Sequence, residues 1–188
     1  MSAPLKSIEG SADIARAMRE IGQRARGASH VLALAPPEQK NRALEGMAAA
    51  VRRHISSILA TNAEDIAEAR AGGVTGAFLD RLSLDPGRIE AIAAGIDAVR
   101  ALKDPVGEIT ESWARPNGMR IERVRVPLGV VGIIYESRPN VTADAGVLCV
   151  KAGNAAILRG GADSIRSSRA ILAALTEGLQ SAGLPGAS

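Results

Sequence analysis

The sequence of 188 residues has few aromatic side chains, one cysteine and two histidines. Aromatic residues make up 2% of the chain, which argues against a stacking platform for single-stranded nucleic acid. The single cysteine, Cys149, excludes an intrachain disulfide and any site built on a cysteine pair. Because His30 and His54 also lack the spacing of metal ligands, we expect no metal site. The core must be built from Ala, Leu, Ile and Val.

Charge blocks and long apolar runs are also missing. The 23 basic and 20 acidic residues are interspersed, which indicates a solvated mixed surface and no nucleic-acid partner. The N-terminus has no apolar signal core, and no apolar run approaches membrane-spanning length. We therefore expect a cytoplasmic protein without a membrane partner.

Residues 1–106 have the periodicity of helices. Apolar positions at helical spacing predict a first helix over 11–34 and a second that begins at Pro36 and Pro37 and carries one apolar face as far as Ile58. Thr61 and Glu64 form a capping box that predicts a short third helix. Another helix is expected to open at residues 85–87 and to continue through Val99.

A period of two replaces the helical period in residues 107–127. Two predicted strands flank Asn117 and Gly118, the residue pair most typical of a tight hairpin turn. The alternation slips by one position in the second strand, which suggests a bulge there. This β-hairpin could be a free appendage or an oligomerisation arm, and the sequence leaves both open.

Residues 128–188 are typical of a parallel α/β unit. A β-branched run over 129–135 predicts a strand buried on both faces, and helix, strand and helix follow over about 142–152, 155–158 and 164–179. Two parallel strands do not complete a sheet, so we expect this chain to be the front part of a longer protein. The fold class is thus α/β, with the start of an incomplete Rossmann-like sheet.

The loop after the first of these strands gathers Ser137, Arg138 and Asn140 at the place where open α/β sheets bind ligands. A helix capped by Thr142 would add free backbone N–H groups, which suit a phosphate or carboxylate. The alternative is that Arg138 simply pairs with Glu136 or with the acidic residue at position 144.

The loop after the second strand contains Arg159, Gly160, Gly161 and Ser164. Glycines allow a cofactor to approach the backbone, although a plain turn before a helix is an equally good interpretation. Lys151 is expected to meet the dipole of its helix and no ligand. Cys149, inside the same helix, is interpreted as an inert small hydrophobe.

Several segments together resemble a known family. These are VPLGVVGIIYESRPNVT over 126–142, LCVKAGN over 148–154 and ILRGG over 157–161, with further matches upstream that extend the resemblance over effectively the whole chain. They resemble the gamma-glutamyl phosphate reductases, or glutamate-5-semialdehyde dehydrogenases, of the aldehyde dehydrogenase superfamily. The resemblance implies NADPH-dependent reduction of L-glutamyl 5-phosphate to L-glutamate 5-semialdehyde, with release of phosphate, in proline biosynthesis.

The resemblance also implies roles for the two loops. Arg159, Gly160, Gly161 and Ser164 would contact the cofactor, and neutral Ala162, near the position where relatives often carry an acidic residue, favours NADP over NAD.

On the substrate side, Ser137 and Arg138 would contact the acyl phosphate. Asn140 is the counterpart of the superfamily's oxyanion-stabilising asparagine, although its spacing from Gly129 is longer than in the superfamily pattern.

The family's nucleophilic cysteine would lie in a catalytic domain beyond Ser188. The chain, a fragment or a natural truncation, is therefore expected to be inactive alone. A non-catalytic interaction or oligomerisation module is the alternative.

Overall fold

The computed structural model describes residues 11–186, so the N-terminal segment without a signal core lies outside the described residues. Seven α-helices, one 3-10 turn and four strands are assigned within that range. In chain order they are α1 (Ser11–Leu34), α2 (Pro37–Arg53), α3 (Ile55–Ala71), α4 (Gly76–Leu82), α5 (Pro86–Ala101), β1 (Ile109–Ala114), β2 (Arg120–Val124), β3 (Val130–Ile134), α6 (Pro139–Lys151), β4 (Ala155–Arg159), η1 (Ala162–Ser164) and α7 (Ile165–Ser181).

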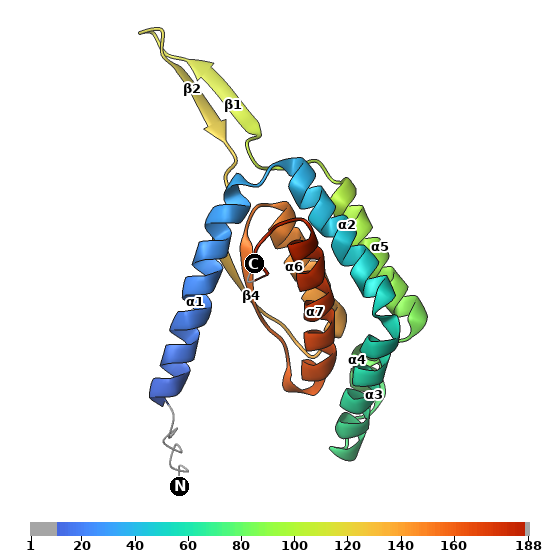
Figure 1. The fold of residues 1–188 in the computed structure, drawn as a ribbon. Coiled ribbons are helices and arrows are strands. Elements are labelled where there is room, and N and C mark those ends of the chain that lie inside the picture. The colour runs from blue at the N-terminus through green and yellow to red at the C-terminus, as the bar shows by residue number, and fades with distance from the viewer. Residues whose placement is uncertain (1–10, 187–188) are drawn as a thin grey trace.

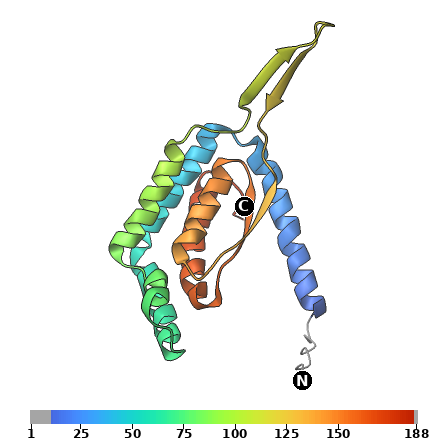
Figure 2. The same ribbon diagram turned by 180° about the vertical axis from the view of Figure 1, so that it is seen from behind.

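The body of the molecule is layered around a small parallel sheet (Figure 1). Strands β3 and β4 pair in parallel through the α6 crossover, as the sequence predicted. Helix α1 packs on one side of β4 and α6 on the other, with α7 beside α6 and the α2–α5 pair outside them (Figure 2). Most of the apolar core lies between α2, α5, α6 and α7 and includes Leu44, Met47, Ile96 and Ile171.

The helical prediction holds for α1 and α5, but the predicted boundary between the second and third helices was wrong. Helix α2 ends at Arg53, His54 lies between the two helices, and α3 begins at Ile55. Thr61 is no cap, because it lies inside α3 and its hydroxyl donates to the carbonyls of Ser57 and Ile58. The capping-box pattern is short and also fits helix interiors, where threonine bonds back to the preceding turn.

Helix α4 was not predicted, because seven residues are too few for a clear period. The start of α5 was predicted correctly: Asp85 precedes it and accepts a hydrogen bond of 2.8 Å from the Arg88 amide, and Pro86 occupies the first turn.

The predicted hairpin is confirmed, and it projects from the body as a two-stranded antiparallel arm (Figure 1). Gly118 has a φ of 84°, and its amide closes the turn by donating to the Arg115 carbonyl at 2.9 Å. The Asn117 side chain also accepts a hydrogen bond from the Met119 amide. The irregularity in pairing lies between Ile109 and Glu111 in the first strand, so the bulge was assigned to the wrong strand. Both faces of the arm are largely exposed.

The prediction that β3 is buried on both faces was wrong. Ile134 is 80% exposed and Val130 is 37% exposed. Within residues 11–186 the parallel sheet has two strands, so the outer edge of β3 pairs with no other strand. The apolar sequence of β3 describes a strand that further sheet elements would cover.

Candidate functional site

The two loops that follow β3 and β4 lie against each other at the carboxyl ends of the strands. The Tyr135 amide donates to the Arg159 carbonyl at 3.0 Å, which continues the ladder past the end of β3. The Ser137 hydroxyl donates to a carboxylate oxygen of Asp163 at 3.0 Å. A side-chain hydrogen bond thus joins the predicted substrate loop to the predicted cofactor loop.

Gly160 and Gly161 permit this contact between the loops. A Cβ on Gly160 would stand 3.1 Å from the ring of Tyr135, and one on Gly161 would stand 2.8 Å from the Ser137 amide nitrogen. Both distances are shorter than ordinary contacts of a Cβ atom. The glycines are therefore explained by the packing of one loop on the other, whether or not a cofactor also approaches them.

Helix α6 begins earlier than predicted, at Pro139, and this changes the position of the site residues. Arg138 is the residue before the helix, and no side chain caps its first turn. Thr142 is buried inside the helix, where its hydroxyl is 2.7 Å from the Tyr135 hydroxyl, so the predicted cap at Thr142 was wrong. Proline is favoured in a first helical turn, and here it overrides the threonine signal.

Asn140 therefore lies in the first turn of α6. Its side-chain amide donates to a carboxylate oxygen of Asp144 at 3.0 Å. Burial raises the pKa of the Asp144 carboxyl, and the hydrogen bond from Asn140 partly opposes that shift. In this arrangement the Asn140 amide is oriented by a neighbouring carboxylate.

The Arg138 guanidinium lies 3.4 Å from a carboxylate oxygen of Glu136, which bears out the pairing that the sequence left open. Arg81, from α4, lies 3.7 Å from the same oxygen. A shallow depression of about 410 Å³ adjoins these arginines. Most of its lining residues are polar or charged, and they are Asp80, Arg81, Ser83, Leu84, Arg88, Ala91, Ile92, Arg138, Asn140 and Asp144.

On the cofactor side, Arg159 and Ser164 differ sharply in exposure. The Arg159 side chain is exposed, and within the described residues it forms no hydrogen bond or ion pair. The Ser164 side chain is fully buried, and its hydroxyl faces the Gly161 carbonyl at 3.4 Å. Arg159 is thus open to a ligand, whereas Ser164 supports the turn from inside.

Sequence reasoning missed Asp65, which caps α7 from a distant helix. Its buried carboxylate accepts hydrogen bonds from the Ser167 amide at 2.8 Å and from the Ser167 hydroxyl. Asn62, one turn earlier on α3, donates to that hydroxyl at 3.0 Å and to the Leu82 carbonyl. Their spacing on one helix could have signalled a shared polar face, but nothing local identified α7 as the partner.

Lys151 does not meet the end of its own helix. Its ammonium group donates to the Arg100 carbonyl in the last turn of α5 and to the Asn41 side chain, both at 2.8 Å. Nearby, the buried Lys40 ammonium lies 2.6 Å from the Asp104 carboxylate. These contacts tie the base of the hairpin to α2, α5 and α6.

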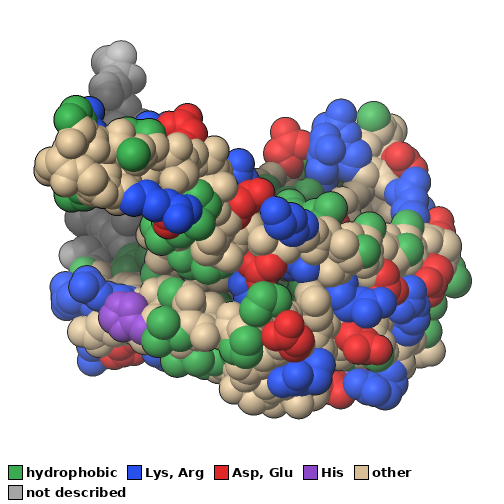
Figure 3. All heavy atoms as spheres, turned by 90° about the horizontal axis from the view of Figure 1, so that it is seen from above, with side chains coloured by type: hydrophobic (Ala, Val, Ile, Leu, Met, Phe, Trp, Pro, Cys, Tyr) green, Lys and Arg blue, Asp and Glu red, His purple; other side chains and the backbone are tan. Residues whose placement is uncertain are grey.

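Cys149 is buried, and burial raises the pKa of its thiol, so the prediction of an inert thiol is consistent with its surroundings. In residues 11–186 no cluster of three or more His, Cys, Asp or Glu side chains could hold a metal ion. No helix in that range is long and apolar enough to cross a membrane. On the face seen in Figure 3, basic and acidic side chains are intermixed.

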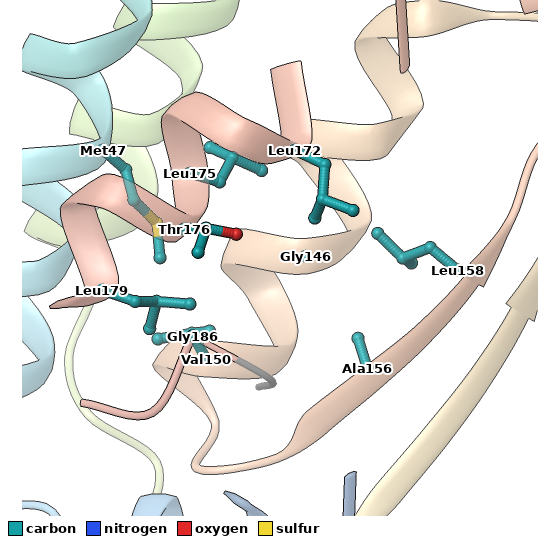
Figure 4. A pocket seen from close by; sticks show the side chains of 10 residues that line it. All are labelled: Met47, Gly146, Val150, Ala156, Leu158, Leu172, Leu175, Thr176, Leu179 and Gly186. Carbon is teal, nitrogen blue, oxygen red and sulfur yellow. The ribbon is translucent and has the colours of Figure 1, made fainter. Parts of the chain in front are cut away.

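A second cavity, of about 180 Å³, lies between α6, α7 and β4 (Figure 4). Its walls are mostly aliphatic, and the Thr176 hydroxyl is the one side-chain oxygen among its lining residues (Figure 4). A charged ligand would be unpaired there, so the depression beside Arg81 and Arg138 is the better candidate for one.

Comparison with known proteins identifies the relatives of this chain. It is 65% identical over 185 residues to the gamma-glutamyl phosphate reductase of Rhodopseudomonas palustris and 63% identical over 187 residues to that of a Bradyrhizobium species. The chain is therefore homologous to gamma-glutamyl phosphate reductases. These matches cover 98% and 100% of the chain but 43% and 44% of the relatives, so the chain spans less than half of their length. No family model matches.

Solved structures of gamma-glutamyl phosphate reductases have the same fold. The enzyme from Thermotoga maritima has a TM-score of 0.87 and 42% identity, with 89% of this chain and 41% of that chain covered. The yeast enzyme has a TM-score of 0.84, 32% identity and coverage of 89% and 44%. An acetylating aldehyde dehydrogenase from Geobacillus thermoglucosidasius shares the fold alone, with a TM-score of 0.68, 16% identity and coverage of 96% and 37%. The α/β fold and the resemblance are thus confirmed, and the alternative of a non-catalytic module gains no support.

Proposed function

We propose that this chain forms the cofactor-side part of an NADPH-dependent gamma-glutamyl phosphate reductase. The reaction would convert L-glutamyl 5-phosphate to L-glutamate 5-semialdehyde and release phosphate, as a step of proline biosynthesis. The chain would work together with residues that correspond to the remaining length of its relatives, which would supply the nucleophilic cysteine. The observation that carries the proposal is the meeting of the two strand-end loops through Ser137 and Asp163, beside exposed arginines on both sides.

The cofactor loop fits a nicotinamide dinucleotide phosphate. Arg159 is exposed and has no partner within the described residues, so its guanidinium can pair with a phosphate without losing an existing contact. Ala162 is neutral and exposed. We propose that Arg159 binds the 2'-phosphate, with the backbone of Gly160 and Gly161 nearby and Ser164 holding the turn. The bound cofactor would supply the hydride.

The substrate loop would bind and orient the acyl phosphate. Arg138 would neutralise an oxyanion of the substrate, with Ser137 holding the loop in place. Asn140 would donate a hydrogen bond to the carbonyl oxygen on which negative charge develops, because its amide is already oriented by Asp144. Cys149 would take no part, since its thiol is buried and has a raised pKa.

In this proposal residues 1–106 and 128–188 belong to the cofactor-side domain, and residues 107–127 form an arm. The arm exposes Trp113 and Met119, which are 40% and 53% accessible, and a second subunit could cover them. We therefore propose that the active protein is a homo-oligomer. We also propose that it is located in the cytoplasm. Deletion of residues 109–124 should lower the number of subunits per particle, measured by light scattering, and an unchanged number of subunits would contradict the role of the arm.

The test of function is phosphate-dependent reduction of NADP by L-glutamate 5-semialdehyde, measured on the enzyme that contains this chain. Arg159→Ala should raise the KM for NADP roughly 10- to 100-fold and the KM for NAD much less, because only NADP carries the 2'-phosphate. Arg42→Ala, which removes an exposed arginine on α2, is the matched control. Equal effects of Arg159→Ala on both cofactors would contradict the assignment, and absence of activity in the unaltered enzyme would contradict the proposed function.

A further inference from the structure

Two arginines from distant parts of the chain converge on one carboxylate oxygen at the edge of the polar depression. Arg138 lies before α6 and Arg81 lies in α4, and their nitrogens are 3.4 and 3.7 Å from the same oxygen of Glu136. A hydrogen bond between a nitrogen and an oxygen is ordinarily about 2.7–3.2 Å long. Both ion pairs are therefore loose, and neither guanidinium has its donors satisfied by Glu136.

Arg81 differs from Arg88, which also lines the depression. The guanidinium of Arg88 donates to the Asp80 carboxylate at 2.7 Å and to the Ser83 carbonyl at 2.8 Å, so Arg88 is committed to holding the end of α4. Within the described residues, Arg81 has the 3.7 Å contact with Glu136 as its ion pair and no side-chain hydrogen bond. Arg81 is thus available to a ligand, whereas Arg88 is not.

The backbone that carries Arg81 is held firmly. Its neighbour Leu82 is fully buried, and the Leu82 carbonyl accepts a hydrogen bond of 2.9 Å from the side chain of Asn62. The same asparagine accepts a hydrogen bond of 2.8 Å from the Leu84 amide. Because this backbone is fixed, ligand binding has to order only the Arg81 side chain, which limits the entropy lost.

The charge balance favours an anion. Arg81 and Arg138 contribute two positive charges and Glu136 one negative charge, so the three groups carry a net positive charge. Glu136 is 69% exposed at its side chain, so it can swing into solvent at little cost. Guanidinium groups present paired N–H donors that match the geometry of carboxylate and phosphate oxygens.

We propose that Arg81 is a specificity-determining residue that binds an oxyanion of the substrate together with Arg138 and displaces Glu136 from both. The inference rests on the proposed function, whose substrate carries a carboxylate and an acyl phosphate. Either group offers the oxygens that the paired guanidiniums require. Arg81 acts on substrate binding and takes no part in cofactor binding.

The experiment uses the enzyme that contains this chain and measures its reverse reaction, in which phosphate and the carboxylate-bearing semialdehyde are separate reactants. Arg81→Gln should raise the KM for one of these two reactants roughly 10- to 100-fold and leave the KM for NADP unchanged. A higher KM for phosphate would show that Arg81 binds the phosphoryl group, and a higher KM for the semialdehyde would show that it binds the carboxylate. Arg81→Lys keeps the charge without the paired donors, so its KM for that reactant should lie between the KM of the unaltered enzyme and that of Arg81→Gln.

A second variant tests the displacement of Glu136. Glu136→Gln removes the competing charge and should lower the KM for the same reactant, which a merely structural role of the ion pairs would not produce. Unchanged melting temperatures would show that both variants are folded, and Arg42→Ala serves as the control. An active enzyme in which neither Arg81 variant changes either KM would overturn the inference alone, whereas an inactive unaltered enzyme would overturn the proposed function on which it rests.

Discussion

The close crossing of α2 and α7 depends on Gly178, and its replacement by alanine should lower the free energy of unfolding. A Cβ on Gly178 would stand 2.5 Å from the Met47 Cα atom and 2.7 Å from the Gly46 carbonyl carbon. Both are backbone atoms, and the Met47 amide nitrogen would be closer still, so no side chain can rotate away. The helices must separate by more than about 1 Å to restore ordinary contacts. Overpacking usually costs about 1–3 kcal/mol, and we expect Gly178→Ala to lie at the upper end.

The effect should be visible in thermal and urea unfolding. For a protein of this size, about 3 kcal/mol corresponds to a fall in melting temperature of about 6–12 °C. Gly95→Ala is the matched control, because Gly95 also lies in a helix but a Cβ there meets no atom within 4 Å. That control should gain up to about 1 kcal/mol from the better helix propensity of alanine. If both variants were equally stable, the close crossing would not matter and the reasoning would be refuted.

Three further predictions concern the loops and the buried groups. Gly161→Ala should raise the KM for NADP in the active enzyme, because its Cβ would push the Ser137 backbone away and break the bond to Asp163; an unchanged KM would contradict the coupling of the loops. Because burial lowers the pKa of Lys151, the unfolded chain binds more protons than the folded chain between that lowered pKa and the ordinary lysine pKa of 10.5. The free energy of unfolding should therefore rise with pH in that window. Lys151→Met should flatten this rise in urea titrations at several pH values, and equal slopes for both proteins would exclude the effect. Cys149 should react with a thiol reagent much more slowly in the folded than in the unfolded protein, and a fast reaction when folded would show that the thiol is accessible.

Local signals in the sequence were sufficient at the hairpin turn and at the starts of two helices. Gly118 adopts the positive φ that the hairpin turn requires, Asp85 caps the helix that starts beside it, and proline starts α2. Each of these residues stabilises a conformation within three or four positions of itself. The same local logic failed at Thr61 and Thr142, where two local preferences compete and packing selects between them.

The candidate site divides along the same line. Its two loops, with Arg138, Asn140 and Arg159, could be found from the sequence because ligands of open α/β sheets bind at the carboxyl ends of parallel strands. The approach of Arg81 to Glu136 could not, since α4 is far from that loop along the chain. The burial of Ser164 could not be predicted either, although its position beside the glycines was visible in the sequence.

Backbone geometry and hydrophobic periodicity are local properties, so the strands, every helix except α4, the hairpin turn and the polar loops at the strand ends could be predicted from the sequence. Only the tertiary structure decided that Gly160 and Gly161 serve the contact between two loops, that Asp65 caps α7, and that two arginines share one carboxylate. Such contacts join residues that are distant in sequence, and they exist because packing of the core brings their backbones to within a few ångströms of each other.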